Sequence, residues 1–176
     1  MEFKILNGSE ITDEKFDIFY NILKKSFLKE EYRSFEKQKA LLNKKIYEIL
    51  FCSIEGKVAG IMAFWHLEEF VFVEHFAVDE GLRGQGIGSK MLDFIKSNLK
   101  TFVILEVELP YNEINRSRID FYARNGFKFN EFEYYQSPLN EGDKPLALRI
   151  MSYPEGLSAK KFKAVRKKLV EAVYKS

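Results

Sequence analysis

Residues 70–92 read FVFVEHFAVDEGLRGQGIGSKML, and this stretch decides how the rest of the chain can be arranged. Residues 70–78 are almost all apolar, which predicts a buried strand. A loop with three glycines at alternate positions follows, and apolar residues then recur at helical spacing over 87–99. The glycines permit tight backbone angles, while the free N–H groups and the dipole of the helix attract an anion. We therefore expect a strand, a phosphate-binding loop and a helix in succession.

Spacing separates the kinds of phosphate-binding loop. A Walker A loop ends in Gly-Lys-Ser/Thr, whereas here Ser89 precedes Lys90 and no glycine adjoins the lysine. A dinucleotide fingerprint, G-x-G-x-x-G, would need its third glycine at Ser89, so it fits only weakly. The pattern that fits without substitution is R/Q-x-x-G-x-G, formed by Arg83, Gly86 and Gly88. A glycine-rich turn that caps an ordinary helix is the remaining alternative.

A second cluster lies downstream and reads NRSRIDFYARNGF. Its Asn115 and Tyr122 share about one helix face and lie about 10 Å apart along the axis. Gly126 suits the end of that helix, and Phe127 starts an alternating strand. Together with the loop, this cluster resembles the GNAT superfamily of N-acetyltransferases. The family has the same loop pattern, and these four positions recur on and after the helix that follows its fifth strand. The resemblance covers residues 70–127.

The resemblance implies both a fold and an activity. The fold is α+β, with a mixed, mostly antiparallel central sheet, helices on both faces and one parallel β-α-β unit. The activity is direct transfer of the acetyl group of acetyl-CoA to a primary amine of a small molecule or peptide. The resemblance assigns the cosubstrate to the end of the strand, the loop and one later asparagine: Phe76, Ala77, Val78, Arg83, Gly84, Gln85, Gly86, Ile87, Gly88, Ser89 and Asn115.

Two residues are the predicted catalytic groups. Tyr122 would return a proton to the departing thiolate, a slightly uphill transfer from a pKa of about 10 to one of about 8.5; a tyrosine packed by its ring is the alternative. Glu74 would be the base, because a carboxylate within an apolar central strand needs a function or a partner. A structural ion pair, the rivals Glu106 and Glu108, or a water relay stay open. Strand alternation directs His75 away from Glu74.

The remaining patterns extend this layout along the chain. Apolar alternation predicts strands at 2–7, 46–54, 58–65, 102–109, 127–135 and 146–153, with a hairpin turn at Glu55-Gly56-Lys57. A helix should begin after Thr12 or Asp13, and another should cover 34–44. We expect a domain over 1–156 and a basic amphipathic helix over 157–176 packed on it.

Composition limits the other classes of function. The chain has 176 residues, 46% of them hydrophobic, and a net charge of only +2, although 160–176 holds seven Lys or Arg residues against one acid. Nucleic-acid binding through that helix and a non-catalytic acyl-CoA sensor are the alternative functions, and the first is not favoured. The single Cys52 excludes an internal disulfide, and no metal is expected. With neither a leader nor an apolar run of spanning length, the sequence favours a cytoplasmic protein, and a homodimer is compatible with it.

Overall fold

The structure is a computed structural model that describes residues 1–175. Its strands are β1 (Glu2–Asn7), β2 (Tyr47–Ile54), β3 (Lys57–Leu67), β4 (Phe70–Val78), β5 (Phe102–Glu108), β6 (Lys128–Gln136) and β7 (Leu146–Tyr153). Its helices are α1 (Asp13–Ser26), α2 (Phe35–Ala40), α3 (Ile87–Leu99), α4 (Glu113–Arg124) and α5 (Ala159–Leu169). Short turns are η1 (Gly8–Glu10), η2 (Lys29–Glu31), η3 (Leu41–Asn43), η4 (Glu80–Leu82) and the π-helical η5 (Val170–Tyr174).

The strands form one seven-stranded sheet in the order β1-β2-β3-β4-β5-β7-β6. It is mostly antiparallel, with one parallel pair and helices around it, which confirms the predicted α+β class. The chain divides into two compact units. Unit 1 comprises Met1–His66 and Val73–Leu99, and unit 2 comprises Leu67–Phe72 and Lys100–Ser176. Whether one domain ends at residue 156 stays a prediction.

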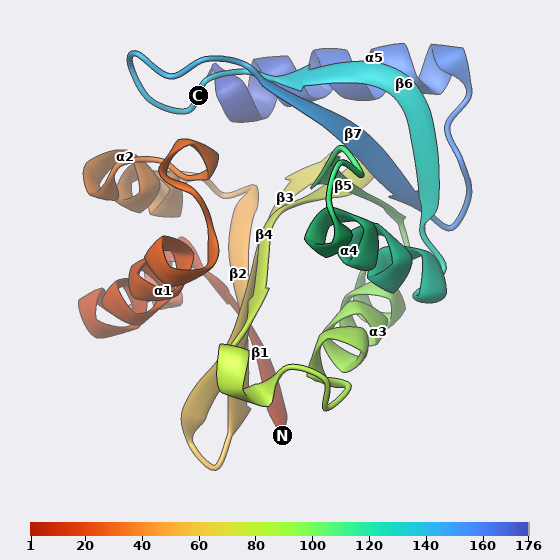
Figure 1. Ribbon diagram of the computed structural model, residues 1–176. Helices are drawn as coiled ribbons and strands as arrows, with labels where there is room; N and C mark the ends of the chain where they lie inside the picture. The colour runs from red at the N-terminus through yellow and green to blue at the C-terminus, as the bar shows by residue number, and fades with distance from the viewer. Residues whose placement is uncertain (176) are drawn as a thin grey trace. The chain divides into compact units, whose positions relative to one another are not determined.

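In unit 1, α1 and α2 lie on one side of the strands and α3 on the other (Figure 1). The Thr12 hydroxyl accepts a hydrogen bond from the Lys15 amide and caps α1, whose Phe16, Phe19 and Leu23 are buried. Glu55 and Gly56, at φ 50° and 77°, make the predicted tight turn between β2 and β3. The helix expected over 34–44 is shorter, since it ends at Ala40 and η3 follows.

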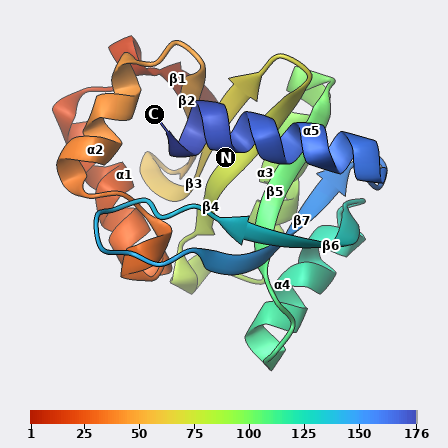
Figure 2. The ribbon, with the colours of Figure 1, turned by 90° about the horizontal axis from the view of Figure 1, so that it is seen from above.

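In unit 2, α5 lies along β6, where the Phe162 ring stacks on Phe132 at 4.7 Å between centroids (Figure 2). The Ser158 hydroxyl caps the helix, and its apolar residues Val165 and Leu169 are buried. The predicted helix over 157–176 is therefore helical from Ala159, and it widens into the π turn η5 at Val170.

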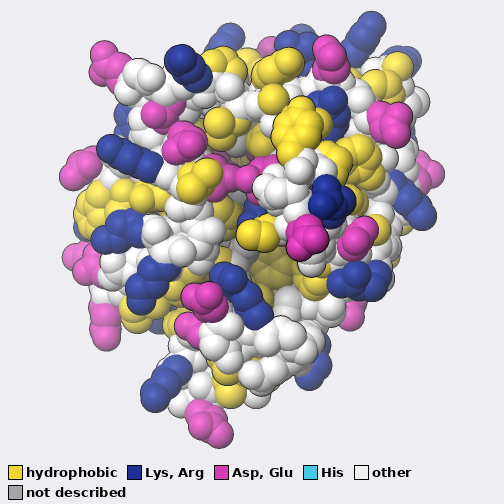
Figure 3. All heavy atoms as spheres, in the orientation of Figure 1, with side chains coloured by type: hydrophobic (Ala, Val, Ile, Leu, Met, Phe, Trp, Pro, Cys, Tyr) yellow, Lys and Arg dark blue, Asp and Glu magenta, His cyan; other side chains and the backbone are white. Residues whose placement is uncertain are grey.

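The surface carries charges of both signs. Basic and acidic side chains are intermixed over the face drawn in Figure 3. Among the described residues, no helix has the length and apolar character needed to cross a membrane. Residues 1–175 also contain no group of three or more His, Cys, Asp or Glu side chains that could hold a metal ion, and Cys52 is a buried free thiol.

Candidate active site

The loop between β4 and α3 is folded by its own polar groups. Asp79 Oδ1 accepts a hydrogen bond from the Gly81 amide at 3.0 Å and so shapes η4. The Arg83 side chain turns back to the strand, where its Nε donates to the Val78 carbonyl at 3.3 Å. The hydrogen bond therefore ties the Arg83 side chain to the end of β4.

Two of the three glycines hold backbone angles that other residues rarely adopt. Gly84 and Gly86 have φ values of 79° and 76°, and a Cβ built on either would meet no atom within 4 Å. The loop thus needs glycine for its backbone angles and leaves open space beside them. Gly88 is different, because it lies inside α3 without a positive φ.

The first turn of α3 contains backbone donors that the helix itself does not use. The Lys90 amide bonds to the Gly86 carbonyl at 3.1 Å, so it already belongs to the helical ladder. The amides of Ile87, Gly88 and Ser89 precede it and have no acceptor within the helix. N–H groups at the positive end of a helix dipole bind phosphate oxygens. The loop therefore fits the diphosphate of a coenzyme such as acetyl-CoA.

A glycine on β3 sets how closely α3 packs. A Cβ on Gly60 would lie 2.8 Å from the Met91 sulfur of α3 and 3.0 Å from the Ala77 carbonyl of β4. The first distance is shorter than real Cβ contacts and the second is tighter than most, so a side chain at this position would require the Met91 side chain and the backbone at Ala77 to shift. Gly60 thereby allows Met91 of α3 and the end of β4 to pack closely against β3.

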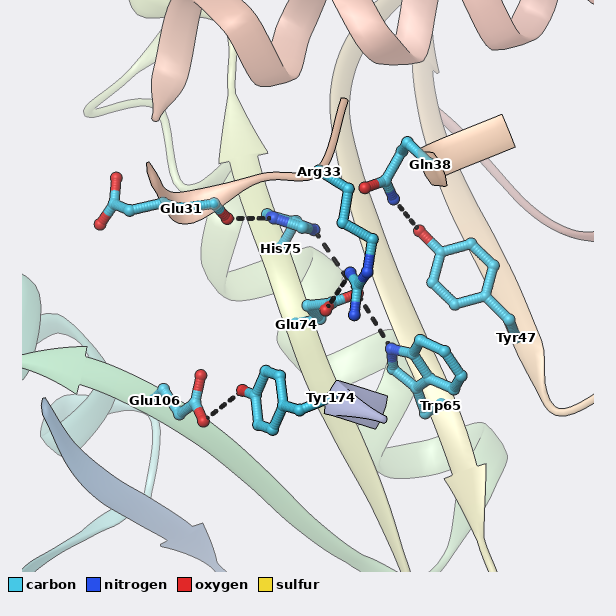
Figure 4. Close-up of polar contacts among 9 residues, drawn as sticks. All are labelled: Glu31, Arg33, Gln38, Tyr47, Trp65, Glu74, His75, Glu106 and Tyr174. Atoms are coloured by element: carbon cyan, nitrogen blue, oxygen red, sulfur yellow. Dashed lines mark hydrogen bonds and ion pairs between the residues drawn. The ribbon is translucent and has the colours of Figure 1, made fainter. Parts of the chain in front are cut away.

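Glu74 on β4 lies in a buried ion pair, the alternative that the sequence left open. Its Oε1 is 2.6 Å from Arg33 Nη1, and its Oε2 accepts a hydrogen bond from Trp65 Nε1 at 2.9 Å (Figure 4). The side chains of Arg33 and Glu74 are only 5% and 4% exposed. Burial alone would raise the pKa of Glu74, but the charge of Arg33 and the hydrogen bonds from Arg33 and Trp65 outweigh it and lower the pKa.

His75 approaches the same ion pair. Its Nε2 lies 2.8 Å from the Glu31 carbonyl oxygen, and its Nδ1 lies 3.8 Å from Glu74 Oε2. Strand alternation therefore does not keep the two side chains apart, because Glu31 and Arg33 on one irregular segment bond to both of them. Burial lowers the pKa of His75, although the charge of Glu74 opposes the shift. The imidazole is thus held neutral, with Nε2–H as the donor to Glu31.

In unit 2, Tyr122 lies on α4 and is buried, with 7% of the residue exposed. The centroid of its ring is 5.8 Å from that of Phe127. Burial raises the pKa of Tyr122 to about 12, with Arg118 opposing the shift. Its hydroxyl therefore holds its proton firmly at neutral pH. Gly126, at φ 91°, ends the helix as predicted.

Asn115, the other predicted residue of α4, links two elements. Its side-chain Nδ2 donates to the Leu109 carbonyl just after β5 at 3.0 Å, and its backbone amide donates to the Asn112 cap at 2.8 Å. On the next turn, Arg118 binds the rival base Glu108, with 2.5 Å between Nη1 and Oε2. Glu108 is thus engaged in a half-exposed ion pair, and Asn115 positions the start of α4.

The second rival base, Glu106, has a partner that sequence patterns did not indicate. Its Oε1 accepts a hydrogen bond from the hydroxyl of Tyr134 on β6 and another, at 2.6 Å, from the hydroxyl of Tyr174 in η5. Tyr174 was expected only as part of a basic helix, and no local motif marks it as a ligand of a carboxylate.

Sequence comparisons with known proteins found acetyltransferases. The sequence profile described as "Acetyltransferase (GNAT) domain" matches residues 45–129. YjbC of Bacillus subtilis (strain 168), named as an acetyltransferase, is 34% identical over 113 residues. That match covers 62% of this chain and only 56% of YjbC.

Solved structures agree with the profile. A protein of Bacteroides thetaiotaomicron assigned to the GNAT family is 32% identical, with a TM-score of 0.89, over 100% of this chain and 99% of its own. An aminoglycoside 6'-N-acetyltransferase in complex with coenzyme A has a TM-score of 0.67 over 90% of this chain and 99% of its own, at 11% identity. At that identity the likeness concerns the fold alone.

Proposed function

Because this chain belongs to the GNAT family of acetyltransferases, we propose that it moves the acetyl group of acetyl-CoA directly to a primary amine of a small molecule or peptide. The observation that carries the proposal is the loop before α3, with two glycines beside open space and a first helical turn whose amides precede the hydrogen-bond ladder. This is the chemistry that a diphosphate requires, and it agrees with the coenzyme A named for one structural neighbour. A cytoplasmic location and a homodimer stay predictions.

The proposed acetyl-CoA contacts follow the strand and the loop. Backbone groups of Phe76, Ala77 and Val78 would bind the pantetheine arm, and the amides from Gly84 to Ser89 would bind the diphosphate, with Arg83 adding charge. The side chain of Gln85 and that of Asn115 on α4 complete the proposed set. Such contacts depend on the backbone more than on side-chain identity, which is why glycines recur in the loop.

Tyr122 is the proposed acid for the departing thiolate. Its pKa of about 12 keeps it protonated, so it always has a proton to give. The same value makes transfer to a thiolate, whose acid has a pKa of about 8.5, uphill unless a direct hydrogen bond assists it. A Tyr122→Phe variant should therefore bind coenzyme A normally and lose turnover. Undiminished turnover would exclude this role, and a wild-type protein that binds without turnover would indicate a sensor.

The base must take a proton from the acceptor ammonium, and Glu74 is the residue predicted for it. Its lowered pKa and its ion pair with Arg33 mean that it accepts a proton only at the expense of that pair. Glu106, Glu108 and a water relay remain the rivals. Assays of Glu74→Gln and Glu106→Gln distinguish Glu74 from Glu106 as the base. The panel of acceptors is an alkyl polyamine, an aminoglycoside and a short peptide with a free amino terminus.

Ligand-dependent stability tests the proposal most directly. Acetyl-CoA at a hundred times its Kd should stabilise the protein by about 2.7 kcal/mol, whereas NAD and ATP should not raise its melting temperature. Gly86→Ala should abolish the stabilisation, because a side chain at φ 76° distorts the loop.

The chain offers a matched control for that variant. Gly56 in the β2–β3 turn has φ 77° and also has no atom within 4 Å of a built Cβ. Gly56→Ala therefore brings the same backbone strain at a distance along the chain from the loop, and it should leave the response to acetyl-CoA intact. Equal loss in both variants, or no response of the wild-type protein, would contradict the proposal.

A further inference from the structure

Three lysines form the outermost face of α5. The apolar side of this helix packs on β6, and at about 100° per residue the opposite side carries Lys160, Lys163 and Lys167. All three lysines are exposed, and the small residue Ala164 is the fourth residue on this side. Because α5 lies along the outside of the strand (Figure 2), the three lysines face solvent in one row. We call them the lysine stripe.

Acidic neighbours neutralise the flank of α5 more than the stripe. Lys161 and Lys168, to one side of the stripe, form ion pairs at 3.1 Å and 2.9 Å. Among the described residues, the ion pair within the stripe is that of Lys167 with Glu171, with 3.9 Å between Nζ and Oε1 and both side chains more than half exposed. Such an exposed pair contributes little. The stripe therefore presents nearly all of its positive charge to solvent.

These charges are unfavourable for the helix itself. Lys160 and Lys161 lie in the first turn, which holds no acid, at the positive end of the helix dipole. Lys163 is three residues from Lys160 and four from Lys167, and like charges at these spacings repel. The Ser158 cap and the packing on β6 hold the helix despite this repulsion. Folding of α5 therefore does not account for the stripe, whereas an anionic partner does.

The length of the stripe matches a nucleic-acid backbone. Seven residues separate Lys160 from Lys167, which at 1.5 Å per residue is about 10 Å. One strand of a duplex carries a phosphate about every 3.4 Å along the axis, so about three phosphates lie within that distance. The one aromatic residue of α5, all of which the structure describes, is the buried Phe162. The helix thus offers charges to a backbone and no exposed ring on which an unpaired base could stack.

A membrane surface fits the same helix less well. An amphipathic helix binds a bilayer by burying its apolar face at the level of the lipid headgroups. In α5 that face is already covered, since Phe162 stacks on Phe132 and Leu169 is 0% exposed. Only the row of charges is left for a partner, and regularly spaced phosphates are the partner that a row of lysines neutralises.

We propose that the lysine stripe is a docking surface for the phosphate backbone of double-stranded nucleic acid, which it binds without regard to base sequence. The composition of the chain alone does not favour this partner, because a run of basic residues is commonly a solvated face. The structure adds that the lysines share one side of a fixed helix and that acids leave them largely unpaired. This docking is a property beyond the proposed acetyl transfer and does not depend on it.

Fluorescence anisotropy of a labelled DNA duplex of about 20 base pairs tests the proposal with the full chain. Binding should be saturable, with a Kd of about 10⁻⁴ M or tighter at about 50 mM salt. Three phosphate contacts predict a slope of about −2.7 for log K against log salt, so affinity should fall about 40-fold from 50 to 200 mM. Duplexes of unrelated sequence should bind alike. No binding at 50 mM salt, or a slope near zero, overturns the proposal.

Charge-matched variants locate the contact. Replacing all three lysines of the stripe by glutamine should weaken duplex binding at least tenfold, and Lys160→Gln alone should make the slope about 0.9 less steep. The control combines Lys25→Gln, Lys29→Gln and Lys37→Gln, since these lysines are also exposed and their loss changes the net charge equally. The control should stay within threefold of the wild-type Kd. Equal weakening in both triple variants would mean that net charge alone attracts the duplex, and the stripe would be excluded.

Other anionic partners are tested in the same way. Vesicles with about a third of their lipid as phosphatidylserine, and poly-glutamate, should bind the protein more weakly than the duplex at equal charge concentration. Tighter binding of either would assign the stripe to a membrane or an acidic protein and overturn the proposal. Both triple variants should keep the wild-type unfolding midpoint and the stabilisation by acetyl-CoA. Failure of acetyl-CoA to stabilise the wild-type protein would contradict the proposed function alone, because duplex binding is measured without the coenzyme.

Discussion

Glu74 and Glu106 are both strand carboxylates, yet their partners give them different chemistry. Glu74 in unit 1 faces a guanidinium at 2.6 Å and an indole N–H at 2.9 Å. Glu106 in unit 2 is bonded by two phenols. A cation neutralises a carboxylate and makes it costly to protonate, whereas neutral hydroxyls orient a carboxylate and leave its charge in place. The partner, more than the residue type or its strand, decides how costly a carboxylate is to protonate.

The largest effect is expected at the ion pair. Arg33→Ala leaves the Glu74 charge buried without its cation, which should lower the free energy of unfolding by about 3–5 kcal/mol in denaturant titrations. Lys39→Ala is the control, because Lys39 and its partner Asp13 are 45% and 87% exposed, and its midpoint should stay at the wild-type value. Similar midpoints for the two variants would show that the buried pair is not a structural element, and the contrast with Glu106 would disappear.

A smaller effect is expected at the phenols. Tyr134→Phe removes one hydroxyl that donates to a charged acceptor, which should cost about 1.5–3 kcal/mol of unfolding free energy. Tyr135→Phe should leave the midpoint unchanged, since Tyr135 is exposed on the same strand. If Tyr134→Phe destabilises as much as Arg33→Ala, then Glu106 depends on its partners as Glu74 does, and the comparison fails.

The smallest effect concerns acid stability. His75 has a pKa below its ordinary 6.5 in the folded protein, so the unfolded chain takes up the proton more readily and stability falls as pH drops below about 6.5. One such group contributes at most about 1.4 kcal/mol per pH unit. The lowered pKa of Glu74 adds a second loss below its ordinary 4.5.

His75→Gln separates these two losses. The variant should flatten the upper part of the curve of unfolding free energy against pH, from about pH 7 to 5, and keep the lower part that belongs to Glu74. Urea titrations at a series of pH values measure both parts. An unchanged upper slope would mean that another group, outside the ion-pair network, controls acid stability.

Patterns of short range predicted much of the fold. The bounds of β1, β4, α3 and β7 are those expected, because alternation, helical spacing and the glycine loop are all local signals. The loop conformation follows from the same glycines, except that Gly88 proved to be helical. Boundaries moved where local signals were weak, as in the short α2.

The partners of the candidate residues were beyond such patterns. Arg33 binds Glu74 across 41 residues and comes from an irregular segment that has no periodicity to follow. Tyr174 reaches Glu106 through a π turn, for which no sequence rule exists. The sequence predicted that Glu74 needs either a function or a partner, but only the structure identifies Arg33 as that partner.

Gly60 gives the loop a remote point of control. It lies on β3, yet a side chain there would crowd Met91 of α3, the helix that follows the loop, and the Ala77 carbonyl at the end of β4. In a selection for altered coenzyme affinity, substitutions at position 60 should therefore be recovered beside those in the loop, although Gly60 carries no side chain and lies outside that loop. Saturation mutagenesis restricted to the visible binding motif would miss it.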